Sequence, residues 1–189
     1  DVLKDRLYCE PASSPVRRAG QAVLFQQARA LATLMAPILA FTAEDIWSEL
    51  PQWPGKEASV HLAALPALES GDAAAAEQLA PLRPLRELVL KQLEPFRAAK
   101  HQSLEAAVTL TLPAAELAAA RAYGAAALAD FFIVSSVELS ECELGATVRE
   151  VGGVKCPRCW KRTAGHGSTR HPDLCPRCDA ALATPNAGG

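Results

Sequence analysis

Two short cysteine motifs near the end of the chain are the residues best suited to chemistry. Each reads Cys-Pro-Arg-Cys: Cys156 and Cys159 belong to the first, Cys175 and Cys178 to the second, and fifteen residues separate them. A two-residue spacer lets both thiolates of a motif reach one ion, and four sulfur ligands form a tetrahedral shell that suits Zn²⁺. Because such a shell leaves no position for water, the pattern predicts a structural zinc site that orders a glycine-rich segment with little core of its own.

Disulfides or a redox switch are the alternative interpretations of these cysteines. The chain opens with Asp-Val-Leu-Lys-Asp-Arg, which does not resemble a secretory signal, so we expect a reducing, cytoplasmic setting. Cys9 and Cys142 have no neighbours at ligand spacing and are interpreted as ordinary thiols. His166 and His171 flank the second motif and could replace a thiolate, although four cysteines already complete the shell.

The segment from residue 152 onward is more basic than the rest of the chain. The whole chain has a formal net charge of −2, whereas this segment holds six basic and two acidic residues, a net charge of +4. Four thiolates with one Zn²⁺ would reduce that charge but leave it positive. A cationic surface attracts the phosphates of a nucleic acid. The alternative, that these charges only keep the segment soluble, is equally compatible with the composition.

Apolar residues at steps of three and four predict helices in the first hundred residues. Long helices are expected over residues 15–36 and 73–100. Between them, Thr42 and Asp45 resemble a capping box that starts a shorter helix, and the position of Trp47 on that helix predicts core packing. Breaks or kinks in the last helix are expected at its three prolines, Pro81, Pro84 and Pro95.

An alternating pattern replaces the helical one after residue 103. Residues 107–112 predict a strand, residues 114–129 an alanine-rich helix, and residues 131–137 and 146–151 two further strands. The fold class that follows is mainly α, with a small α/β piece and a terminal four-cysteine zinc ribbon. The expected division is a helical bundle at 1–101, the α/β piece at 102–151 and the zinc module at 152–189.

Several classes of protein are excluded by what the sequence lacks. Its most apolar stretch, residues 23–41, is interrupted by charged, amide and proline residues, so we expect no membrane partner. The sequence contains no glycine-rich phosphate loop with its lysine, no Gly-x-Ser-x-Gly elbow and no His-Glu-x-x-His helix. No residue is therefore predicted to be catalytic.

Four segments resemble bacterial isoleucyl-tRNA synthetases, in the same order and over nearly the whole chain. They read Asp-Val-Leu-Lys-Asp-Arg-Leu-Tyr (residues 1–8), Met-Ala-Pro-Ile-Leu-Ala-Phe-Thr-Ala-Glu-Asp-Ile-Trp (35–47), Ser-Leu-Glu-Ala-Ala-Val-Thr-Leu (103–110) and Lys-Cys-Pro-Arg-Cys-Trp (155–160). The second segment also resembles valyl- and leucyl-type relatives, whereas the last two are similar to the isoleucine enzyme. The resemblance implies the C-terminal part of that enzyme: an anticodon-binding bundle, truncated at its start, followed by a zinc-bearing end.

The resemblance also implies partners and cofactors. The parent would join isoleucine to its tRNA using ATP, and this chain would bind that tRNA as one part of the longer synthetase. The ATP-handling signatures of the family, His-Ile-Gly-His and Lys-Met-Ser-Lys-Ser, are absent from this sequence, so ATP is expected only in the remainder. One structural Zn²⁺ is the expected cofactor here. The alternatives are a free-standing zinc-ribbon adaptor for nucleic acid or protein, and an inactive remnant.

Recognition of an anticodon predicts aromatic and cationic contacts. Proteins read unstacked RNA bases by stacking and edge hydrogen bonds, while cations hold the phosphates. Trp160, directly after a predicted zinc ligand, is the candidate stacking residue, and packing within the small module is its alternative role. The candidate phosphate or base-edge contacts are Arg158, Lys161, Arg162 and Arg177 in the module, with Arg17 and Arg18 in the bundle.

Overall fold

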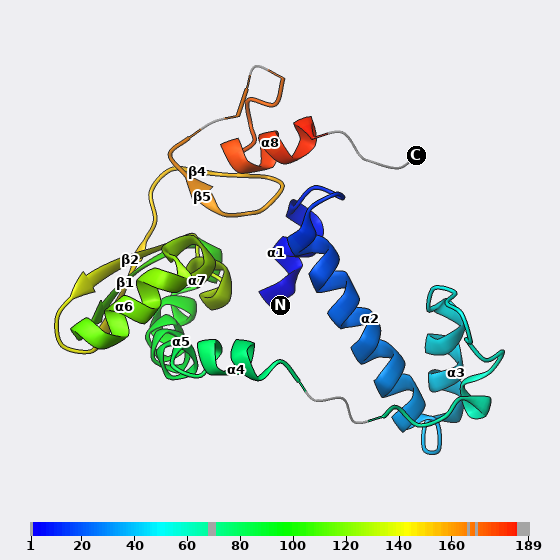
Figure 1. The fold of residues 1–189 in the computed structure, drawn as a ribbon. Helices are drawn as coiled ribbons and strands as arrows, with labels where there is room; N and C mark the ends of the chain where they lie inside the picture. Colours follow the sequence, from blue (N-terminus) through cyan, green and yellow to red (C-terminus); the bar gives the residue numbers. More distant parts are fainter. Residues whose placement is uncertain (1, 68–70, 166, 169, 185–189) are drawn as a thin grey trace. The chain divides into compact units, whose positions relative to one another are not determined.

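The computed structural model describes residues 2–67, 71–165, 167–168 and 170–184. The chain folds as two compact units: Asp1–Ala12 with Asp72–Gly189 form unit 1, and Ser13–Gly71 form unit 2. Figure 1 labels the helices and strands of both units. Helices predominate and the sheets are small, which confirms the mainly helical class. Within the described ranges, no helix has both the length and the apolar character needed to span a membrane.

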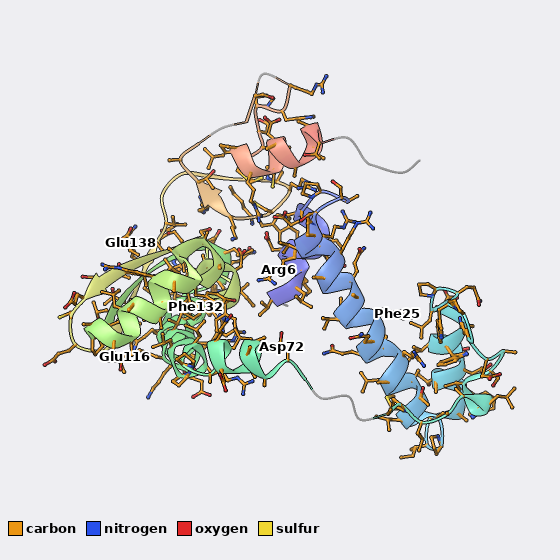
Figure 2. The ribbon with its side chains drawn as sticks, viewed as in Figure 1. Arg6, Phe25, Asp72, Glu116, Phe132 and Glu138 are labelled. Atoms are coloured by element: carbon orange, nitrogen blue, oxygen red, sulfur yellow. The ribbon has the colours of Figure 1, made fainter. Side chains whose placement is uncertain are left out.

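Unit 2 is built from α2 (Pro15–Met35), α3 (Ala40–Glu49) and the 3₁₀ turn η1 (Val60–Leu62). Trp47 is 2% exposed and packs in the small core of this unit, which confirms its predicted role. Its indole N–H donates to the Glu57 carbonyl at 2.9 Å, so the buried polar end of the ring is satisfied. Phe25, labelled in Figure 2, belongs to the same unit and lies on the side of α2 toward α3.

The start of α3 differs from the prediction. The helix begins at Ala40 with Leu39 as the preceding cap residue, so the capping box predicted at Thr42 and Asp45 is wrong. Glu44 has a different role, because its carboxylate accepts hydrogen bonds from the Ser59 hydroxyl at 2.8 Å and from the Val60 N–H at 3.0 Å. These bonds tie α3 to η1.

The helices of unit 1 include α1 (Val2–Cys9), α4 (Ala73–Leu79) and α5 (Leu82–Ala98). The break between α4 and α5 at Pro81 agrees with the prediction. Pro84 lies in the first turn of α5, where a missing N–H is tolerated. One face of α5 is buried; it consists of Leu82, Leu85, Val89 and Leu93.

A three-stranded sheet forms the centre of unit 1. The middle strand β1 (Ala106–Leu112) pairs parallel with β2 (Ser136–Glu141) and antiparallel with β3 (Gly145–Glu150). Side chains from these strands join those of α5, α6 and α7 in one core. The strands predicted at residues 107–112 and 146–151 are therefore confirmed. The segment that connects the parallel strands β1 and β2 is long enough for the crossover that parallel pairing requires.

The connection between β1 and β2 differs from the sequence prediction. The alanine-rich stretch forms two helices, α6 (Ala114–Tyr123) and α7 (Ala125–Phe132), joined at Gly124, whose φ of +94° suits glycine. Phe132 ends α7 and is fully buried (Figure 2), so the strand predicted over residues 131–137 is wrong in its first half. Strand β2 begins only at Ser136.

Candidate metal centre and the surface beside it

The first cysteine motif, residues 156–159, lies in the turn of a short hairpin. Strands β4 (Val154–Lys155) and β5 (Arg162–Thr163) pair antiparallel on either side of it. The Cys156 N–H donates to the Lys161 carbonyl at 2.9 Å, and the Trp160 N–H donates to the Cys156 carbonyl at 2.8 Å. These bonds fold the motif into a compact turn, called here the first knuckle.

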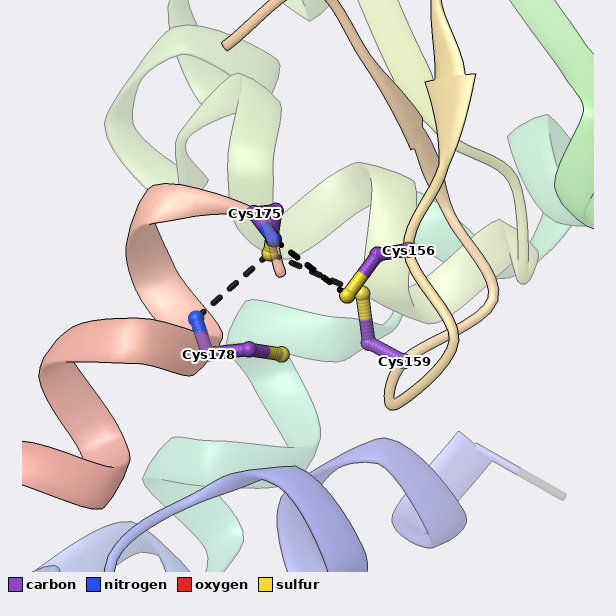
Figure 3. Close-up of side chains that lie close together, drawn as sticks. All are labelled: Cys156, Cys159, Cys175 and Cys178. Atoms are coloured by element: carbon purple, nitrogen blue, oxygen red, sulfur yellow. Dashed lines mark hydrogen bonds between the residues drawn. The ribbon is translucent and has the colours of Figure 1, made fainter. Parts of the chain in front are cut away.

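The second motif, residues 175–178, forms a second knuckle at the start of α8 (Pro176–Ala183). The Cys175 sulfur accepts a hydrogen bond from the Cys178 N–H at 3.4 Å, so it caps the helix as an oxygen would. Proline at the first helical position costs no hydrogen bond. The Cys175 N–H also donates to the Cys156 sulfur at 3.4 Å, which joins the two knuckles (Figure 3).

The four thiols converge from the two knuckles, as Figure 3 shows. All four cysteines are buried, and their Sγ atoms lie within 4.8 Å of one another. A tetrahedral ion with Zn–S bonds of about 2.3 Å would place neighbouring sulfurs about 3.8 Å apart. The Cys159 and Cys175 sulfurs are 3.8 Å apart. The four sulfur donors and their spacing therefore fit a metal ion that is coordinated by four thiolates.

The pKa values of these thiols depend on their surroundings. Burial alone would raise the pKa of Cys156, but the backbone N–H groups that surround its sulfur outweigh burial and lower it to about 6. Burial raises the pKa of Cys159 to about 12 and that of Cys178 to about 11, and nearby thiolates add to the effect. A bound cation would stabilise the thiolate form of all four, because coordinating thiols are deprotonated.

Two of the predicted RNA contacts, Arg158 and Arg177, hold α1 against the knuckles. Arg177 makes a two-pronged ion pair with Asp5, with both N···O distances at 2.6 Å. Arg158 donates to the Cys9 carbonyl at 2.6 Å, and the Cys9 thiol donates to the Arg158 carbonyl at 3.7 Å. Burial alone would raise the pKa of Asp5, but the Arg177 guanidinium outweighs burial and lowers that pKa below its ordinary value. Both guanidinium groups therefore have partners within the chain.

Two more predicted contacts, Lys161 and Arg162, join the first knuckle to the α/β core. The Lys161 ammonium forms an ion pair with Asp130 of α7. The Arg162 guanidinium lies 3.3 Å from the Glu105 carboxylate, and its backbone N–H donates to the Ser135 hydroxyl at 2.9 Å. These positive charges are therefore partly offset by carboxylates.

Trp160 differs from those cations because its side chain is exposed. It is 58% exposed and has a φ of +65°, in the left-handed region that is costly for any residue except glycine. The indole helps to line a hollow of about 540 Å³, whose wall also includes Tyr8 of α1 and the apolar Leu104 and Ile133. The Lys155 ammonium lies 5.9 Å from the centre of the Trp160 ring. An aromatic face beside positive charge is suited to binding an RNA base.

Some residues of this site were not predicted from the sequence. Cys9 is buried in one cluster with the four predicted ligands, although it is far from them in sequence. Tyr8 and Lys155 carry no spacing signal that would place them beside Trp160. Among the described residues, only the four cysteines form a group that could hold a metal ion, and His171 is not a member. His166 lies outside the described residues.

The remaining predicted contacts, Arg17 and Arg18, belong to unit 2. Both lie in the first turn of α2, where Arg18 is exposed and Arg17 is partly buried. The first turn of a helix carries a partial positive charge, to which these two side chains add. They therefore make the start of α2 cationic.

Comparisons with known proteins place the chain in a family. A family model described as the anticodon-binding domain of tRNA ligase matches residues 1–109. Isoleucine--tRNA ligases of Kosmotoga olearia and Geobacter sulfurreducens are 39% and 37% identical to it, each over 96% of the chain. The Azoarcus sp. isoleucine--tRNA ligase is 40% identical over 94% of the chain. The chain spans about a fifth of the length of these curated relatives, 20–21% in each case.

Proposed function

The chain belongs to the family of anticodon-binding domains of tRNA ligases, and we propose that it is the tRNA-binding, C-terminal portion of an isoleucine–tRNA ligase. The family match covers residues 1–109, and the similarity to isoleucine–tRNA ligases continues through the cysteine motifs. Its partners would be isoleucine tRNA and the remainder of the ligase. ATP and the residues that join isoleucine to tRNA would belong to that remainder.

Within this function, we assign separate roles to three segments. Residues 1–101 would form the anticodon-binding bundle, residues 102–151 the connecting α/β piece, and residues 152–189 the zinc module. One Zn²⁺ ion bound by Cys156, Cys159, Cys175 and Cys178 would order the module. The buried thiols and their spacing support this assignment.

The observation that carries the RNA-binding proposal is the conformation of Trp160. A left-handed backbone costs a bulky residue about 1–2 kcal/mol, and glycine would avoid that cost. The side chain does not recover this cost by burial, because 58% of it is exposed. Strained residues are retained where function requires them. An unstacked base of the anticodon loop that stacks on this ring would give the tryptophan such a function.

The predicted cations would contribute unequally to phosphate binding. Arg177, Lys161 and Arg162 face carboxylates, which reduces their pull on phosphate. Arg158 donates to the Cys9 carbonyl rather than to a carboxylate. We add Lys155, which is exposed beside Trp160, and retain Arg17 and Arg18 of α2 as a separate contribution.

A binding comparison tests this function. The zinc-loaded chain is titrated with isoleucine tRNA and with the same tRNA carrying a different anticodon, at one stated salt concentration, because phosphate binding depends strongly on salt. We expect weaker binding to the anticodon variant. Equal affinities would leave only nonspecific RNA binding and would contradict anticodon recognition. A free-standing zinc-ribbon adaptor for nucleic acid or protein, the alternative, would not distinguish the two anticodons, and the family match over residues 1–109 does not favour it.

A further inference from the structure

The two knuckles carry arginines at equivalent positions, and both arginines reach the same helix. Each occupies the place directly before the second cysteine of its motif: Arg158 in the first knuckle and Arg177 in the second. Arg158 bonds to the last residue of α1, Cys9, and Arg177 bonds to Asp5 one turn earlier. Two points of attachment on one face of a helix fix its position and its rotation.

The same arginines also interact across the metal centre. Arg177 lines one hollow together with Cys159, which belongs to the first knuckle. Burial raises the pKa of the Cys178 thiol of the second knuckle, and the Arg158 guanidinium opposes that rise. Each arginine is therefore near a thiol of the opposite knuckle and also bonds to α1. The Cys9 side chain, 3% exposed, closes the same cluster.

Charge explains why such an arrangement would favour a metal-loaded centre. A Zn²⁺ ion with four thiolates carries a net negative charge, and removing such a charge from water is unfavourable unless it is compensated. Two guanidinium groups beside the sulfurs compensate it. Partners that orient or neutralise metal ligands commonly change metal affinity about 10–100-fold when they are removed.

We propose that Arg158 and Arg177 are positioning residues that couple the metal centre to α1, so that a loaded centre docks α1 and docked α1 slows loss of the metal. The ion fixes the two knuckles relative to each other, and thereby fixes the two guanidinium groups at the spacing that Cys9 and Asp5 require. In return, α1 covers one side of the sulfurs. This role is separate from RNA binding, but it rests on the metal site of the proposed function.

The first test measures α1 itself. Hydrogen exchange, read by mass spectrometry on the 189-residue chain, compares residues 2–9 with residues 82–98 of α5 before and after a chelator removes zinc. We expect exchange in residues 2–9 to rise at least tenfold on metal removal, while α5 keeps its protection because its core does not include the knuckles. Unchanged exchange in residues 2–9 would overturn the coupling.

The second test measures the metal. Release of zinc to a chromogenic chelator is compared for the wild type, Asp5→Asn, Arg177→Gln and the double variant, with Arg170→Gln as the matched control, since Arg170 is an exposed arginine of the same segment. We expect about tenfold faster release from each single variant, little more from the double variant, and wild-type release from the control. Wild-type release from Asp5→Asn would overturn the proposal while leaving the metal site intact. A wild-type chain that retains no zinc would overturn the site and the coupling together.

Discussion

Replacing Trp160 by glycine separates an RNA-binding role from a packing role. The substitution removes about 1–2 kcal/mol of left-handed backbone strain, and the greater freedom of glycine in the unfolded chain offsets about 0.5–1 kcal/mol of that gain. Because the ring is 58% exposed, little buried contact is lost. We therefore expect the free energy of unfolding to stay within about 1 kcal/mol of the wild type. Loss of one stacked base should cost about 1–3 kcal/mol of binding, roughly a 5- to 150-fold weaker Kd.

Two assays on the same zinc-loaded samples measure these effects. Fluorescence anisotropy with a labelled anticodon stem-loop gives the Kd, and urea denaturation followed by circular dichroism gives stability. Trp47→Ala is the contrasting variant, because that ring is 2% exposed and its removal should destabilise unit 2 by about 3–5 kcal/mol. If Trp160→Gly were to lose stability in the same way while binding the stem-loop as tightly as the wild type, the reasoning from exposure and strain would be refuted.

Three further predictions concern the metal and the charges. Cys175→Ser should make residues 152–184 sensitive to protease and weaken zinc binding while leaving most helicity, because the cores of α2 and α5 lie outside the cysteine cluster; a protease-resistant variant would contradict this. Zinc uptake at pH 8 should release about two or more protons per ion, since the pKa values of Cys159 and Cys178 are raised to about 12 and 11; calorimetry in buffers of different ionisation enthalpy counts them, and fewer than two would count against coordination by these thiols. Replacing both Arg17 and Arg18 by Gln should flatten the dependence of log Kd on log salt by about one per lost phosphate contact; an unchanged slope would remove them from the interface.

Local spacing was sufficient to predict which four thiols lie together, and their role as metal ligands stays a prediction. Two residues between cysteines set which thiols can converge, and the structure brings all four within 4.8 Å. The place of Cys9 could not be predicted in this way. Cys9 reaches the cluster only because α1 docks on knuckles about 150 positions away in the sequence, and such docking leaves no periodic signal.

The intrinsic preference of residues for strands also led to one wrong strand prediction. The run Phe131 to Val137 is rich in aromatic and β-branched residues, which favour strands when neighbours are ignored. In the structure, Phe131 and Phe132 complete α7, because that placement buries Phe132 in the core between α5 and the sheet. Tertiary packing therefore decided where the helix ends. The same limit applies to Lys161, Arg162 and Arg177, whose carboxylate partners lie on distant segments.

The most direct test of the central claim is the affinity for isoleucine tRNA with and without zinc. The chain is stripped with a chelator under reducing conditions, divided, and one half is reloaded with a single equivalent of zinc. We predict at least tenfold weaker binding by the stripped chain and full recovery on reloading, because the metal-ordered knuckles hold Trp160 and Lys155 in place. Equal affinities for the stripped and reloaded samples would contradict the claim that a metal-ordered surface binds the RNA.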